Sequence, residues 1–167
     1  MRPSSWRRRE VTAESRLAGD RTLRRLAGVL AAAVAGIHLY WALPVAVQQL
    51  QFGILHDPRP AAFLLATMAM LMGVLLVVQG FDPLPVYIGG IVLMLVFLVG
   101  YAAWHTVLDH GAFWPGRPAH GGHSDLGPIR LVAAHLQDDS LAFVSKIAET
   151  ALLAVLSVLT VRELSDR

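Results

Sequence analysis

Long apolar runs alternate with shorter polar segments along this chain. Four of the runs have the length of about 20 residues that a helix needs to cross the roughly 30 Å hydrocarbon core of a bilayer. These runs cover residues 26–47, 61–80, 85–108 and 141–161. Only the second and third are closely joined, and Asp82 and Pro83 between them are typical of a tight turn. The pattern therefore predicts an all-α integral membrane protein with four transmembrane helices in an antiparallel bundle.

The composition agrees with this prediction and narrows the chemistry. Hydrophobic residues make up 55% of the 167 residues and charged residues only 16%, whereas soluble domains carry about 25% charged residues. The chain has no cysteine, which excludes disulfides, thiolate metal sites and cysteine nucleophiles. It also contains no phosphate-binding loop, dinucleotide-binding fingerprint or serine nucleophile elbow.

The distribution of positive charge predicts an orientation. Residues 1–25 form a tail with eight arginines, and residues 162–167 form a second tail with two more. The connections on the other side of the predicted bundle hold only Arg59, Arg117 and Arg130. Because positive residues favour the cytoplasmic side, we expect both tails in the cytoplasm, a membrane domain over residues 26–161, and a plasma-membrane type of location. Residues 109–140 then form a long outer loop.

The arginine-rich tail has two other interpretations. Basic clusters also bind anionic lipids and nucleic acids. Glu10, Glu14 and Asp20 interrupt the positive run, however, and anchoring on the cytoplasmic side already explains it. We therefore expect the lipid bilayer, and no nucleic acid, as a partner of this chain.

The histidines are the most informative polar residues. On the predicted topology all seven lie in the outer half of the protein, and the outer loop adds several aspartates. Histidine and carboxylate ligands together suit borderline metals such as zinc and copper. If the third helix reaches residue 109, His105 and Asp109 stand on one face, and a helix before the fourth span would do the same for His135 and Asp139. The candidate metal ligands are His105, Asp109, His110, His123 and His135, with His38 as a deeper one.

These ligands do not form a recognised signature. His120 and His123, which flank two glycines, could close over an ion. Short histidine-rich tracts are nevertheless only compositional hints, and solvated loop histidines remain the alternative. A haem b between His38 and His105 is a minority interpretation, because their predicted depths differ by about six residues, or about 9 Å.

Three ionisable residues are expected inside the bilayer. Lys146 and Glu149 lie three residues apart in the fourth span and so share a helix face. His38 in the first span is expected at the same depth as Glu149. Charges within a span are costly and mark functional sites by default. This predicted polar cluster could relay protons, bind an ion or hold the helices together.

Two further patterns lie in the apolar spans. Met68 and Met72, four residues apart and near the expected depth of His38, would suit Cu(I), although such methionines are more often core residues. Gly28, Ala32 and Gly36 place small residues on one face of the first span. Such faces let helices approach closely, which would support packing in the bundle, a homo-oligomer or a larger membrane complex.

Three functions remain open from the sequence. The first is a small membrane protein that binds copper or zinc at a histidine-rich outer face, for metal handling or as a subunit of a redox complex. The second is a metal-dependent membrane enzyme, either a hydrolase or an oxidoreductase. The third is a structural accessory subunit without a site, in which the buried charges only fix helix pairing.

Overall fold

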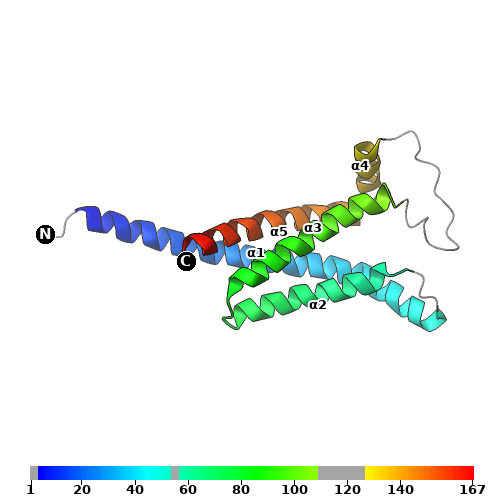
Figure 1. The fold of residues 1–167 in the computed structure, drawn as a ribbon, viewed down its shortest axis with the longest axis horizontal. Helices are drawn as coiled ribbons and strands as arrows, with labels where there is room; N and C mark the ends of the chain where they lie inside the picture. Colours follow the sequence, from blue (N-terminus) through cyan, green and yellow to red (C-terminus); the bar gives the residue numbers. More distant parts are fainter. Residues whose placement is uncertain (1–3, 54–56, 109–126) are drawn as a thin grey trace.

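The protein is all-helical in the parts of the chain that its structure describes. The computed structural model describes residues 4–53, 57–108 and 127–167. Their helices, drawn in Figure 1, are α1 (Ser4–Phe52), α2 (Arg59–Val78), α3 (Pro83–His105), α4 (Pro128–Asp138) and α5 (Ser140–Ser165). The predicted runs 26–47 and 141–161 lie within α1 and α5, whereas 61–80 and 85–108 extend two and three residues past the ends of α2 and α3. The helical part of the prediction is confirmed, with these differences at two boundaries.

Four of these helices have the length and composition of membrane spans. They are α1 over Ala18–Phe52, together with α2, α3 and α5. Large apolar side chains such as Leu65, with 68% of its surface exposed, and Val78, with 77%, face outward from the bundle. A surface of this kind is stable in lipid and aggregation-prone in water, so the helices indicate an integral membrane protein.

The first helix is longer than the apolar pattern predicts. It begins at Ser4 and continues without a break into the span, so the segment before residue 26 is helical as well. Arginine, alanine and leucine are good helix formers, and a helix already nucleated extends at little cost. Near its other end α1 contains Pro44, which removes one hydrogen bond of the helix.

The helix boundaries follow local capping chemistry. Gly80, with a φ of 85°, ends the segment after α2 in a conformation that suits glycine. The Asp82 side chain then accepts a hydrogen bond from the Leu84 N–H and so caps α3. Asp139 caps α5 in the same way, by accepting from the Ala142 N–H. The short helix α4, which the apolar pattern did not define, begins at Pro128 and buries Leu131.

The helices pack unequally around the core. Helix α1 packs along α2 and α5, and α3 packs along α5, whereas α2 and α3 make fewer contacts and diverge from their shared turn (Figure 1). Fully buried Val34, Met94 and Leu152 lie at the centre. Ion pairs at one end join Arg24 to Glu163 and Arg162 to Asp20. We call this the arginine end, and the opposite one the α4 end.

Candidate functional site

Glu149 is the centre of the most buried polar group in the described residues. Its side chain is 0% exposed, on the face of α5 that packs against α1. Its Oε1 atom accepts a hydrogen bond of 2.8 Å from the Ser145 hydroxyl, one turn earlier on the same helix. The Lys146 ammonium lies 2.8 Å from Oε1 and 2.6 Å from Oε2. A buried carboxylate requires such partners, since its unpaired burial would cost several kcal/mol.

His38 completes this group from α1. Its Nε2 atom lies 3.1 Å from Glu149 Oε1 and 3.4 Å from the Ser145 hydroxyl oxygen. Because an ionised carboxylate only accepts hydrogen bonds, we assign the imidazole hydrogen to Nε2. The Nδ1 atom is buried and has no hydrogen-bond partner among the described residues. We call His38, Ser145, Lys146 and Glu149 the buried cluster.

Two phenylalanines hold the His38 ring in place. Its centroid lies 4.8 Å from that of Phe63 on α2 and 4.3 Å from that of Phe97 on α3, with the latter ring edge-on. Apolar rings on these sides exclude water and restrict rotation of the imidazole. The hydrogen bond to Glu149 is therefore formed by a side chain that packing has already oriented.

Lys146 connects the buried cluster to the α4 end. Its ammonium donates to the Phe97 carbonyl oxygen at 3.4 Å and lies 5.0 Å from the centre of the Tyr101 ring. The Tyr101 ring in turn lies 4.4 Å from the His105 ring, and the His105 ring lies 4.2 Å from that of His135. We call Tyr101, His105 and His135 the ring row. It leads from the buried charges to helix α4.

The tautomer of His135 follows from its backbone contact. Its Nδ1 lies 2.9 Å from the Leu131 carbonyl oxygen, one turn earlier in α4. A carbonyl can only accept, so Nδ1 carries the hydrogen and the lone pair resides on Nε2. Histidine ligands of metals usually show this arrangement.

The structure brings some of the predicted residues together and leaves others apart. His38, Lys146 and Glu149 meet in the buried cluster, and His105 meets His135. The predicted pairing of His135 with Asp139 on one helix face is wrong, because α4 ends at Asp138 and Asp139 caps α5. The condition for pairing His105 with Asp109 also fails, since α3 ends at His105.

The remaining candidate ligands lie outside the described residues. They are Asp109, His110, His120 and His123. His56 of the other loop also lies outside the described residues. Within the described ranges, no group of three or more histidine, aspartate or glutamate side chains is arranged to hold a metal ion. The outer-face metal site therefore stays a prediction.

The structure does not bring together the residues of the predicted Cu(I) and haem sites, nor does it pack a helix on the predicted small-residue face. Met68 and Met72 of α2 are 68% and 55% exposed, whereas His38 is buried inside the bundle. The His38 and His105 rings each have separate partners, Phe63 and Phe97 for the first and Tyr101 and His135 for the second. Gly28 and Gly36 have open space where a Cβ atom would stand, so no neighbouring helix in the described bundle packs closely on them.

Sequence reasoning missed the aromatic surroundings of these groups. Phe63, Phe97 and Tyr101 read as ordinary apolar or interfacial residues. Arg59 was counted only as a charge, but its guanidinium group binds Asp57 at 2.6 Å and lies 4.1 Å from the centre of the Trp104 ring. A usable signal is the position of Phe97 and Tyr101, four residues apart on α3 and hence on one face.

Comparison of the chain with models of known protein families, with curated proteins and with solved structures gives no match. The buried cluster contains an imidazole and an amine, each within hydrogen-bonding distance of the same carboxylate. These are the groups that exchange protons in proteins.

Proposed function

We propose that this protein transfers protons within the membrane, with Glu149 as the central proton acceptor and donor. The observation that carries the proposal is the set of hydrogen bonds that His38, Ser145 and Lys146 direct at a fully buried carboxylate. Intramembrane carboxylate and histidine groups commonly serve as proton relays in pumps and transporters. The cluster also combines residues from α1 and α5, so a change in its charge affects how two spans pack.

The transfer needs one proton from outside the buried cluster, delivered to His38 Nδ1 by a hydronium ion that is left as water. As Nδ1 takes this proton, Nε2 releases its own to Glu149 Oε1, which leaves the imidazole neutral with its hydrogen on the other nitrogen. Glu149 then carries the proton as a neutral acid until it releases it. Lys146 balances the negative charge of Glu149 whenever the carboxylate is ionised. Ser145 donates to Oε1 and keeps the carboxylate oriented.

The ring row supplies a route toward the α4 end. Tyr101, His105 and His135 follow one another at ring separations of 4.4 Å and 4.2 Å. The phenol and each of the two imidazoles can donate a proton and can also accept one. We infer that protons move between the buried cluster and the α4 end along these three side chains.

The proposed setting is a four-span antiparallel bundle in a plasma-type membrane, with both tails in the cytoplasm. The arginine-rich segment and the positive-inside rule support this orientation. The contacts of α1 with α5 support the antiparallel arrangement, because Arg24 pairs with Glu163 while His38 pairs with Glu149. The α4 end is then the outer face.

Proton flux through reconstituted protein tests this function. The full-length chain is placed in liposomes that contain a pH-sensitive dye, and a potassium diffusion potential provides the driving force. We expect a flux with the wild type that Glu149→Gln lowers about a hundredfold, the lower end of what a positioned acid–base group contributes. His38→Gln, which keeps a side chain that can donate to Glu149 but cannot carry a proton, should also lower the flux.

Glu163→Gln is the matched control. Glu163 is also a carboxylate on α5, but it pairs with Arg24 at the arginine end, and its loss should leave the flux unchanged. The proposal would be overturned if the proton flux into liposomes with the wild-type protein were no greater than the flux into empty liposomes. Equal fluxes for the wild type and Glu149→Gln would also overturn it and would leave the cluster with a structural role.

A second candidate function is transition-metal binding at the α4 end. The observation that favours it is the 4.2 Å separation of the His105 and His135 rings, together with the Nδ1 contact of His135 to a carbonyl. Two imidazoles from different helices can bind one zinc or copper ion if further ligands approach. We propose Asp109, His110 and His123 for that role, by their place in the sequence.

Metal titration separates this candidate from proton transfer. Zinc and copper are titrated into the purified full-length protein by calorimetry. If the candidate holds, the double variant His105→Ala/His135→Ala loses binding at the stoichiometric site, whereas His38→Gln retains it. Absence of a saturable site in the wild type would refute metal binding and would leave the proton-transfer proposal intact.

A further inference from the structure

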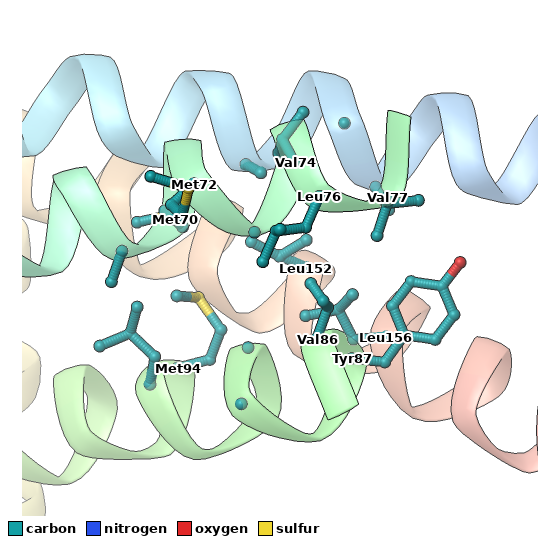
Figure 2. Close-up of a pocket in the computed structure, with 18 of the residues that line it drawn as sticks. Met70, Met72, Val74, Leu76, Val77, Val86, Tyr87, Met94, Leu152 and Leu156 are labelled. Atoms are coloured by element: carbon teal, nitrogen blue, oxygen red, sulfur yellow. The ribbon is translucent and has the colours of Figure 1, made fainter. Parts of the chain in front are cut away.

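A large apolar pocket lies between the helices near the arginine end. Its volume is about 920 Å³, which is near the upper limit of the 300–1,000 Å³ typical of ligand sites. Figure 2 shows Met70, Met72 and Leu76 on one side, Tyr87 and Met94 on the other, and Leu152 between them. No residue of the buried cluster lines this pocket, so it is separate from the proposed proton site.

The pocket opens toward the surroundings of the bundle along the gap between α2 and α3. Its walls include Met72 and Val92, each of which is 55% exposed. Gly28 and Gly89 also line it, and a Cβ atom on either would meet nothing within 4 Å. The lining is therefore apolar, with room beside the helix backbones, and faces the region where the acyl chains of a bilayer lie.

An unsatisfied polar group lies in this apolar lining. Tyr87 is only 4% exposed, and its hydroxyl has no hydrogen-bond partner among the described residues. Its oxygen is the red atom at the right of Figure 2, away from Met94. A buried hydroxyl without a partner destabilises the protein, and a ligand oxygen beside it would remove that cost.

Positive charge lies at the same end of the pocket. Arg24 and Arg25 both belong to its lining, and Arg24 acts electrostatically on Tyr87 together with the carboxylates of Glu163 and Asp20. Arg24 shares its charge with Glu163 at 3.4 Å and is still 48% exposed. Arg25 is exposed and forms no ion pair within the described part of the chain. Two guanidinium groups and a phenol hydroxyl are well suited to bind a phosphate.

We propose that this pocket binds one membrane glycerophospholipid with a negatively charged headgroup. An acyl chain occupies the groove between α2 and α3, and the headgroup phosphate lies at Arg24 and Arg25, where it accepts a hydrogen bond from Tyr87. The charge of the arginine end selects an anionic over a zwitterionic lipid. The lipid fills the space that the divergence of α2 and α3 leaves in the bundle.

Native mass spectrometry of the full-length protein in detergent tests this assignment. Phosphatidylglycerol and phosphatidylcholine with identical acyl chains are added separately, and the number of lipids retained per protein is counted. We expect one phosphatidylglycerol to be retained under conditions that remove phosphatidylcholine. Arg25→Gln should weaken retention about fivefold, the effect expected from about 1 kcal/mol per arginine near an anionic headgroup. Tyr87→Phe should also weaken the retention of phosphatidylglycerol.

Matched variants separate this pocket from general lipid adhesion. Gly89→Leu fills the groove and should abolish retention, whereas Gly100→Leu places the same side chain in open space elsewhere on α3 and should not. Arg21→Gln removes a charge from the same end outside the lining and should have little effect. Equal retention of both lipids by the wild type overturns the proposal. So does a wild-type dimer that Gly89→Leu converts to a monomer, because the groove would then bind a second copy of the chain.

Discussion

His38 Nε2 lies 3.1 Å from Glu149 Oε1, although 111 positions separate the two residues in the chain. The contact joins α1 to α5 between two side chains that are almost completely buried, with 6% and 0% of their surfaces exposed. An acid and an imidazole in such surroundings depend on each other, because removal of either leaves a buried polar group without its partner. This dependence makes the following predictions specific.

Removal of the Glu149 charge alone should destabilise the protein strongly. Glu149→Leu leaves Lys146 buried without its counter-charge, and we expect the free energy of unfolding to fall by about 3–5 kcal/mol. The double variant Lys146→Met/Glu149→Leu should recover most of this loss, because no uncompensated charge remains. Denaturant unfolding in mixed micelles measures both. A double variant that is no more stable than Glu149→Leu would contradict the prediction.

Replacement of His38 by phenylalanine tests the hydrogen bond separately from the packing. The new ring keeps the contacts with Phe63 and Phe97 but donates nothing to Glu149. We expect a loss of about 1–3 kcal/mol in the free energy of unfolding. Tyr40→Phe is the control on the same helix, since Tyr40 is 73% exposed and its change should stay within about 0.5 kcal/mol. Equal effects of the two substitutions would argue against the assigned bond.

Gly90 of α3 faces the side chain of Leu156 on α5. A Cβ atom at this position would lie 2.7 Å from Leu156 Cδ1. Gly90→Val should therefore cost about 1–3 kcal/mol through overpacking, whereas Gly100→Val, with nothing within 4 Å of its Cβ, should be nearly neutral. Thermal unfolding of the two variants provides the comparison. A neutral Gly90→Val would mean that the Leu156 side chain moves aside without loss.

Arg59 should stabilise the α4 end through its aromatic contacts. Its guanidinium carbon lies 4.1 Å from the centre of the Trp104 ring and 5.5 Å from that of Trp41. Arg59→Ala should cost about 0.5–2 kcal/mol, the range for cation–π contacts, and should shift the tryptophan fluorescence. Arg130→Ala, which removes an exposed arginine of α4, is the control and should change neither. An unaltered emission spectrum in Arg59→Ala would speak against the stacking.

Part of the site could be predicted because helical geometry is regular. Lys146 and Glu149 share a face at any position in a helix, and counting residues along the spans gives His38 and Glu149 the same depth. The packing of Phe63 and Phe97 on the His38 ring could not be predicted, because it depends on how α2 and α3 rotate about their axes. The contact of His105 with His135 required helix α4, whose apolar residues are too few to form a span.

The sequence by itself determined the four apolar helices and the residue types inside them, because the thickness of a bilayer sets the length of a span. Only the tertiary structure decided which of the polar residues meet. Asp139 was a candidate partner of His135 and instead caps α5. Tyr87, unremarkable in the sequence, is buried in an apolar pocket, where no described residue forms a hydrogen bond with its hydroxyl. Local order in a helix follows from backbone hydrogen bonds within one segment, whereas these contacts follow from side-chain packing between segments far apart in the chain.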